Sequence, residues 1–207
     1  MIRHIGASDG RAKASDHGRF GMEWRTVFFA CAIYCSVILL FTVISLYTAP
    51  KASQVGTFRP AATIPSHEAI LALFGLGLGL AASLFLRKLD LSLVILAPAL
   101  VLLTDLDHFP SYFDVAQPIR PAHSFIFILS AVALMAMVIR RTDVELISLS
   151  AFFAHLAVDT GVFPPLSPIS FSYYDIGSFR IPFLVAAVSF AVAAGFVLRR
   201  GKLGDLT

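Results

Sequence analysis

The segment WRTVFFACAIYCSVILLFTVISLY, residues 24–47, is strongly apolar and carries a single charged residue, Arg25. A helix of roughly 20 apolar residues is long enough to cross a lipid bilayer. A signal peptide also places an apolar segment after a basic one, but its apolar core is usually about 7–15 residues long. We therefore predict that residues 24–48 form a retained N-terminal transmembrane anchor.

The composition of the whole chain agrees with a membrane location. Of the 207 residues, 57% are hydrophobic and 14% are charged, whereas a soluble domain carries about 25% charged residues. The net charge of +3 comes from basic residues that separate apolar segments and form no stripe, so we do not expect nucleic acid as a partner. Cys31 and Cys35 lie on one face of the first apolar segment, where packing is the expected role.

Five more apolar segments follow a polar, proline-bearing linker. They cover approximately Ser66–Leu86, Leu89–Thr104, His123–Ile139, Val144–Val158 and Ile181–Leu198. The second and fourth of these are short for a span of roughly 20 residues, but they can cross if their ends reach a polar cavity lined by protein. The sequence predicts an all-α, polytopic membrane protein with about six transmembrane helices.

The distribution of basic residues predicts how these apolar segments are oriented in the membrane. Twelve of the 16 Lys and Arg residues fall on one predicted side and four on the other, and the richer side is normally cytoplasmic. We therefore expect a multi-pass protein of the cytoplasmic (inner) membrane with both termini in the cytoplasm. The expected units are a basic cytoplasmic tail (1–23), the anchor (24–48), an extracytoplasmic linker (49–65), a five-helix membrane-embedded domain (66–198) and a second basic tail (199–207).

Seven histidines and aspartates lie at the ends of the apolar segments, all on the predicted outer side. Ionisable residues at membrane segments are costly to bury and are functional candidates by default. Imidazole and carboxylate groups suit zinc, manganese or iron, and a carboxylate-rich site also takes magnesium. We predict a divalent metal site, most simply zinc, with one or more ions held among these residues: His67, Asp105, Asp107, His108, His123, His155 and Asp159.

Two short motifs carry most of this prediction. Asp105-Leu106-Asp107-His108 places two carboxylates and an imidazole within four residues, although capping aspartates in a solvated loop are an alternative. His155 and Asp159 share one helix face because they are four residues apart. Asp159 is either a ligand or the partner that orients His155, and a polar pair that simply ends the helix is the alternative.

Two further residues are candidates for catalytic roles. Arg120 can bind a phosphate with two hydrogen bonds, although an interfacial arginine that reaches head groups is also possible. Glu68 follows His67 at the predicted outer end of a span, and it shares with Asp107 the candidacy for general base. The sequence does not rank these two carboxylates.

Glycines and aromatic residues mark two other features. Gly75-Leu76-Gly77-Leu78-Gly79 lies within an apolar segment and is followed by no Lys-Ser/Thr pair, so we interpret it as a close-packing helix face and not as a phosphate loop. Aromatic residues on the outer side form either an interfacial belt or a lid over the site: Phe163, Phe171, Tyr173, Tyr174 and Phe179.

The order of these motifs resembles the YdjM-type family of membrane-bound metal-dependent hydrolases. The resemblance covers roughly residues 66–165, and its most specific part is Asp-Leu-Asp-His-Phe-Pro at residues 105–110. The chain departs from the family at Arg120-Pro121-Ala122-His123-Ser124, because the family has His-Arg followed by Thr-His-Ser. Arg120 would then take the role of the family's arginine, although it lies at a shifted position. The departure affects the expectation that the chain is active.

The resemblance implies a hydrolase, and the His-x-x-x-Asp element is similar at fold level to zinc-dependent phospholipase C. The expected substrate is a phosphoester of a membrane lipid or lipid-linked molecule at the outer face, attacked by water that the metal activates. A catalytically silent scaffold clipped by metal and a metal or solute transporter are the alternatives. The oligomeric state stays open.

Overall fold

The computed structural model describes residues 24–48, 64–84, 89–113, 120–159 and 162–204. The predicted tail at residues 1–23 and nearly all of the predicted linker lie outside these ranges. Six long helices occupy the six predicted apolar segments, which confirms the all-α prediction. They are α1 (Trp24–Thr48), α2 (Ile64–Leu84), α3 (Leu91–Leu103), α4 (Phe125–Val138), α5 (Thr142–Val158) and α6 (Arg180–Gly204).

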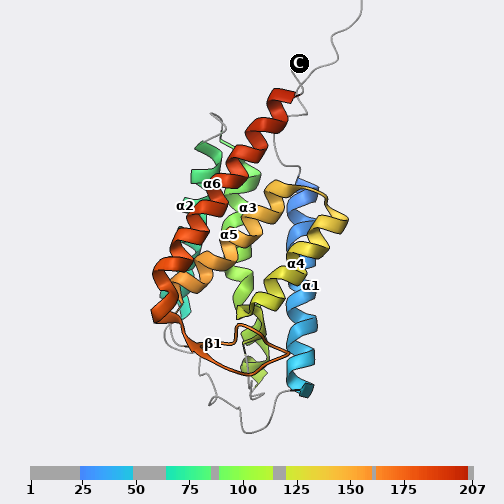
Figure 1. Ribbon diagram of the computed structural model, residues 1–207, viewed down its shortest axis with the longest axis vertical. Helices are drawn as coiled ribbons and strands as arrows, with labels where there is room; N and C mark the ends of the chain where they lie inside the picture. Colours follow the sequence, from blue (N-terminus) through green and yellow to red (C-terminus); the bar gives the residue numbers. More distant parts are fainter. Residues whose placement is uncertain (1–23, 49–63, 85–88, 114–119, 160–161, 205–207) are drawn as a thin grey trace, which may run out of the picture.

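Short elements connect these helices at one end of the bundle. Three 3-10 helices are present in the described ranges, η2 (Thr104–Phe113), η3 (Pro121–His123) and η4 (Ile176–Phe179). An antiparallel pair of two-residue strands, β1 (Val162–Phe163) and β2 (Tyr174–Asp175), closes the loop before α6. Figure 1 shows β1 at the same end of the bundle as the green η2 segment.

Four helices of the described chain are long and apolar enough to cross a membrane. These spans cover Trp24–Thr48, Ser66–Leu84, Leu91–His108 and Ile176–Arg200, and α4 is a shorter apolar helix. The fifth helix, α5, has 17 residues with Asp143 and Glu145 in its first turn. The structure therefore describes a helical membrane protein with four candidate spans, and the prediction of six spans stays a prediction.

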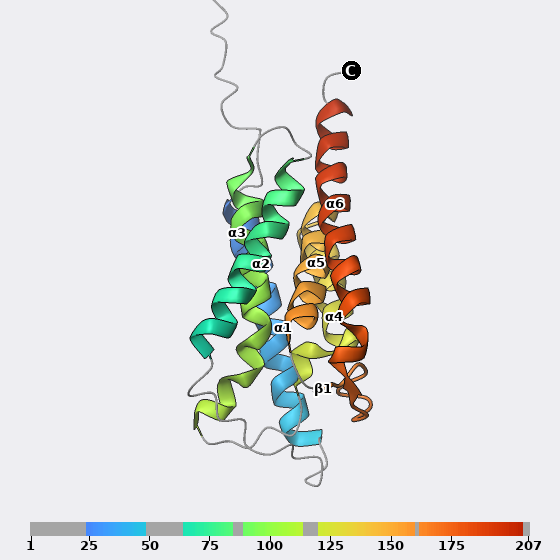
Figure 2. The same ribbon diagram turned by 90° about the vertical axis from the view of Figure 1, so that its left-hand side faces the viewer.

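The helices form two layers of three. One layer holds α1, α2 and α3, the other holds α4, α5 and α6, and the contacts α1–α4, α3–α5, α2–α5 and α2–α6 join them. Figure 2 shows α2 and α3 on one side of the molecule and α5 and α6 on the other. Consecutive helices run in opposite directions, and most of α5 is buried between its neighbours. A short helix surrounded by protein in this way does not need the length of a lipid-exposed span.

The glycine pattern of α2 forms a close contact with α3. A Cβ atom added at Gly75 would lie 2.5 Å from the Pro98 Cα atom, and one at Gly79 would lie 2.8 Å from the Val94 Cα atom. At Gly77 the same atom would meet nothing within 4 Å. Small residues four apart thus let two backbones approach closely, as the sequence predicted.

The first helix is part of the core and not a peripheral anchor. Tyr34 of α1 is fully buried, and its ring packs edge-on against Phe127 of α4 with centroids 5.0 Å apart. Its hydroxyl lies 3.1 Å from the Thr104 Oγ1 atom at the start of η2. Thr104 donates to the Leu100 carbonyl, so Tyr34 is the donor in this pair. The helix α1 thereby holds the segment that carries Asp105.

The loop before α6 buries some of its aromatic residues and exposes others. Phe163 is buried, and its ring contacts those of Phe125, Phe179 and Phe183. Tyr174 is half exposed. Part of the predicted aromatic set therefore packs inside the bundle, where it fastens the loop to α4 and α6.

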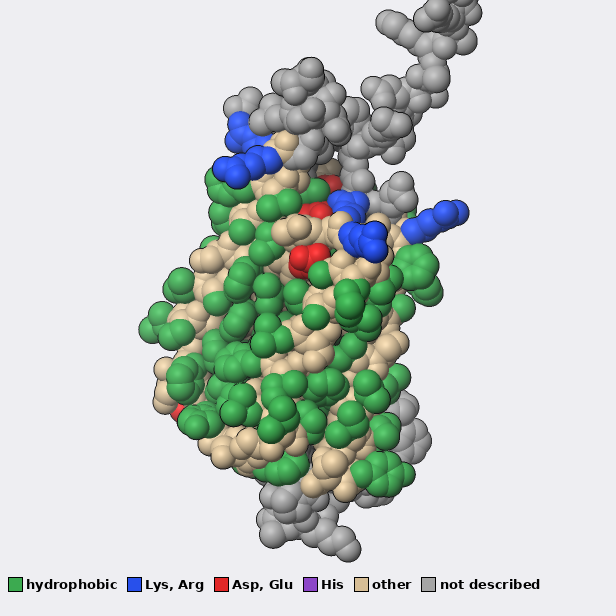
Figure 3. All heavy atoms as spheres, turned by 45° about the vertical axis from the view of Figure 1, so that its right-hand side comes forward, with side chains coloured by type: hydrophobic (Ala, Val, Ile, Leu, Met, Phe, Trp, Pro, Cys, Tyr) green, Lys and Arg blue, Asp and Glu red, His purple; other side chains and the backbone are tan. Residues whose placement is uncertain are grey.

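Charge is distributed unevenly along the bundle. Figure 3 shows a broad band of hydrophobic side chains with Lys and Arg side chains gathered toward one end. Arg25 lies in the first turn of α1, Arg140 and Arg141 lie between α4 and α5, and Arg199 and Arg200 lie near the end of α6. All these positions are at the end opposite to η2, η3 and the β1–β2 pair.

Candidate metal centre

The end of α3 provides carbonyl groups that side chains of the centre can bind, because the last carbonyl groups of the helix lack partners within it. The final four carbonyls of any α-helix need partners from elsewhere. The Leu100 carbonyl accepts from the Thr104 hydroxyl at 3.1 Å, and the Val101 carbonyl accepts from the His155 Nδ1 atom at 3.0 Å. A histidine of α5 therefore caps α3 where the chain passes into η2.

This hydrogen bond orients His155. A carbonyl oxygen only accepts, so the Nδ1 atom carries a proton, and in the neutral ring the Nε2 atom is the one left to bind an ion. The His155 side chain is fully buried, and its Nε2 atom lies 3.4 Å from the Asp105 Oδ1 atom. The ring is fixed in the tautomer that a metal ion requires.

The carboxylate of Asp107 orients the ring of His123. Its Oδ2 atom accepts from the Ala122 N–H at 3.0 Å and from the His123 Nδ1 atom at 3.3 Å. Both side chains are fully buried. A carboxylate behind the imidazole is the usual partner of a metal-binding histidine, so this geometry favours an orienting role for Asp107.

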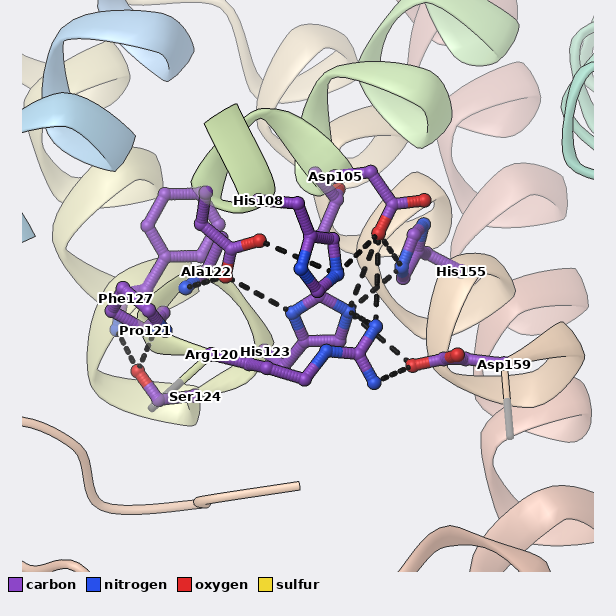
Figure 4. A network of polar contacts seen from close by, with 12 residues as sticks. Asp105, His108, Arg120, Pro121, Ala122, His123, Ser124, Phe127, His155 and Asp159 are labelled. Atoms are coloured by element: carbon purple, nitrogen blue, oxygen red, sulfur yellow. Dashed lines mark hydrogen bonds and ion pairs between the residues drawn. The ribbon is translucent and has the colours of Figure 1, made fainter. Parts of the chain in front are cut away.

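The two histidines meet at Asp105, as Figure 4 shows. The His123 and His155 Nε2 atoms lie 2.9 Å apart, and the Asp105 Oδ1 atom lies 3.8 Å from the first and 3.4 Å from the second. Two ligands about 2.1 Å from a tetrahedral ion lie about 3.4 Å apart. Asp105, His123 and His155, which we call the first donor set, therefore fit a divalent ion in type and spacing.

A second donor set shares Asp105. It consists of Asp105, Asp107 and His108, whose donor atoms lie within 4.8 Å of one another. The His108 Nε2 atom lies 3.3 Å from the Asp105 Oδ1 atom and 3.8 Å from the Asp107 Oδ1 atom. His67 lies near the other oxygen of the same carboxylate, with its Nε2 atom 3.9 Å from the Asp105 Oδ2 atom. A carboxylate shared between two donor sets is compatible with two neighbouring ions.

Arg120 and Asp159 complete the centre. The Arg120 Nη1 atom lies 2.5 Å from the Asp159 Oδ2 atom, and the Nη2 atom lies 2.6 Å from the His123 Nε2 atom. Burial alone would raise the pKa of Asp159, but its contact with His123 and the charge of Arg120 hold that pKa well below its usual range. For Arg120, burial alone would lower the pKa, but the carboxylates of Asp159, Asp107 and Asp105 together raise it. Both groups are therefore charged.

The structure brings all nine candidate residues to one end of the bundle, in different roles. Glu68 is half-buried and close enough to Asp105 to interact with it. Asp159 ends α5 in an extended conformation, and its carboxylate lies 3.3 Å from the His123 Nε2 atom. The interpretation of Asp107 as a general base is not favoured by its burial.

Sequence reasoning did not find three groups that shape the centre. They are the Val101 carbonyl, the Ala122 N–H and the hydroxyl of Tyr34. Two of them are backbone groups, which leave no mark in residue identity. Tyr34 lies in an apolar segment among other aromatic residues, so no pattern distinguishes it there.

Comparisons with protein-family models, with curated proteins and with solved structures found no match to this chain. The resemblance to the YdjM-type family therefore stays an interpretation of the motifs.

Proposed function

We propose that this chain is a membrane-bound, metal-dependent hydrolase that acts on a phosphoester of a lipid or lipid-linked substrate. The observation that carries the proposal is the convergence of Asp105, His123 and His155 with both imidazoles held in the metal-binding tautomer. Burying these polar groups together is costly. The three residues come from three separate elements, η2, η3 and α5.

The residues of the first donor set would hold the ion, and Asp107 and the Val101 carbonyl would keep the two rings aimed at it. A divalent ion in such a site supplies a water whose pKa is lowered toward neutrality. Zinc suits this mixture of imidazole and carboxylate ligands, with manganese or magnesium as further candidates. The second donor set and His67 would provide for another ion.

Arg120 and the apolar surface of the bundle support the proposed substrate class. A guanidinium beside a metal centre stabilises negative charge that develops on a phosphate. The described bundle is apolar over most of its length, so a lipid is the substrate that reaches such a site without leaving the bilayer. Glu68 is the candidate general base, because it is half-buried beside Asp105.

Elemental analysis tests the proposal on the full chain purified in detergent. We expect near-stoichiometric zinc or manganese in the wild type and its loss in the His155→Ala/Asp159→Ala variant. Asp175→Asn is the matched control, because Asp175 is an exposed carboxylate in the loop before α6. Phospholipids and lipid-linked phosphates are then screened for metal-dependent phosphoester hydrolysis. A wild-type protein that binds no metal after reconstitution would contradict the proposal.

A catalytically silent protein is the second candidate, and one observation favours it. The guanidinium of Arg120 already pairs with Asp159 and His123, so the centre is compensated without an ion. In that case metal would act only as a structural clip. Full metal content with no turnover of any phosphoester, together with loss of thermal stability on chelation, would support this candidate over the hydrolase.

A further inference from the structure

The guanidinium of Arg120 lies among the atoms that would bind the ion. Its Nη2 atom is 2.6 Å from the His123 Nε2 atom and 3.7 Å from the Asp105 Oδ1 atom. Its Nη1 atom is 2.5 Å from the Asp159 Oδ2 atom. The side chain is 22% exposed, so it enters the centre from the rim and places its cationic end inside.

These contacts and metal binding require the same electron pairs. The His123 Nδ1 atom faces the Asp107 carboxylate, so its proton lies there and the Nε2 atom has one lone pair. An imidazole nitrogen that accepts a hydrogen bond from a guanidinium cannot at the same time bind an ion at about 2.0–2.1 Å. We propose that Arg120 and the metal ion are alternative occupants of this donor set, so that metal binding displaces the arginine. This inference rests on the metal centre of the proposed function.

The charges explain why the metal-free centre needs an internal cation. Asp105, Asp107 and Asp159 are largely buried within one cluster. Buried carboxylates without a partner are strongly destabilising, and Arg120 provides one positive charge to two of them. A divalent ion would provide two charges in the same place. Either Arg120 or the ion can neutralise the negative charge of the carboxylates. If both were present, they would compete for the His123 Nε2 atom.

The displacement is confined to the Arg120 side chain. Pro121 restricts the backbone directly after it, and the Ala122 N–H is anchored to Asp107 at 3.0 Å. The released guanidinium therefore stays beside the ion, where an anionic phosphoester would lie. Arg120 becomes a positioning residue for the substrate only after the ion has entered, which couples anion binding to metal occupancy.

Zinc affinity tests this competition in the detergent-purified full chain. Zn²⁺ is titrated against a chromogenic chelator for the wild type, Arg120→Ala and Arg180→Ala. We expect Arg120→Ala to bind zinc about 10- to 100-fold more tightly, the range that corresponds to removing hydrogen bonds to charged groups. Arg180 is the control for a lost charge, because its Nη2 atom donates to the Asp159 carbonyl at 3.2 Å and not to a carboxylate or imidazole of the donor sets.

The outcomes separate this inference from the proposed function. Tighter binding in Arg120→Ala with little change in Arg180→Ala supports the competition. Equal or weaker binding in Arg120→Ala, or an equal gain in Arg180→Ala, overturns it and leaves the metalloenzyme standing. Zinc binding in Arg120→Ala but not in the wild type supports the competition and overturns the proposed function. Zinc binding in neither overturns both.

A second measurement uses the wild type alone and does not depend on a variant that folds. Phenylglyoxal modifies accessible arginines, and peptide mapping reports each one. We expect the modification rate of Arg120 to rise severalfold when Zn²⁺ is added, because the guanidinium leaves Asp159 and His123. Arg141 is the internal control, because it pairs with Asp143 at 2.7 Å at the other end of α5. A rate for Arg120 that is unchanged or lower with zinc would overturn the inference.

Discussion

His123 and His155 face each other through Nε2 atoms that are 2.9 Å apart, although 32 positions separate them in the chain. Their other ring nitrogens are held from behind, by Asp107 and by the Val101 carbonyl. Two nitrogens at this distance that both lacked a proton would repel each other unless a positive charge lay beside them. The hydrogen bonds behind the rings therefore create a position that a cation stabilises.

Asp107 is expected to set the metal affinity through His123. In Asp107→Asn the side chain keeps its shape but loses the charge that orients and polarises the imidazole. Loss of such a partner typically weakens metal binding about 10- to 100-fold. A zinc titration with a competing chelator measures this change, with Asp175→Asn as the control. An unchanged affinity would show that Asp107 does not act through His123.

The glycines of α2 are expected to differ in their tolerance of alanine. A Cβ atom at Gly75 or Gly79 would overlap backbone atoms of α3, and forcing helices apart in a packed core typically costs about 1–3 kcal/mol. Gly77→Ala is the matched control, because its Cβ would meet nothing within 4 Å. Thermal unfolding in detergent should show a lower midpoint for Gly75→Ala and Gly79→Ala alone. Equal midpoints for all three variants would contradict the close contact.

Asp159 is expected to make the metal-free protein sensitive to acid. Its folded-state pKa lies below the value of about 3.9 in an unfolded chain. A lowered carboxyl pKa contributes stability that is complete above the unfolded value and is lost as the pH falls through the folded value. We expect this contribution to be constant between about pH 5 and 8 and to decline below about pH 4.

The measurement is acid unfolding of the metal-free wild type beside Asp159→Asn. The variant should start less stable at pH 6 and lose less stability below pH 4, because it has no carboxylate to protonate. Asp175→Asn again serves as the control, since that exposed residue caps η4 through the Ser178 N–H. Parallel curves for wild type and Asp159→Asn would contradict the assignment.

The two ends of the bundle are expected to lie on opposite sides of the membrane. The distribution of basic residues predicts that the centre lies on the outer side. In a chain with Cys31 and Cys35 replaced by alanine, Ser178→Cys should react with an impermeant maleimide on intact cells. Thr142→Cys, at the start of α5, should react only after permeabilisation. The reverse labelling pattern would place the metal centre on the cytoplasmic side.

Much of the fold was predictable because hydropathy is a local property. Each of the six apolar segments became a helix, and the spacing of Gly75 and Gly79 indicated a close contact before its partner was known. Residue counts alone did not establish how many helices span the membrane. The short α5 is surrounded by other helices, and burial by protein removes the length requirement that lipid imposes.

Residue types and their spacing were enough to predict a helical membrane protein and the set of polar side chains at one end of the bundle. Which atoms of these side chains face one another depends on how the helices pack. This packing made Asp107 the partner of His123, joined α1 to the centre through Tyr34, and placed Arg120 among the donor atoms. Apolar character is a property of each residue and can be read locally. The orientation of an imidazole ring depends on hydrogen bonds to distant elements, including backbone groups such as the Val101 carbonyl.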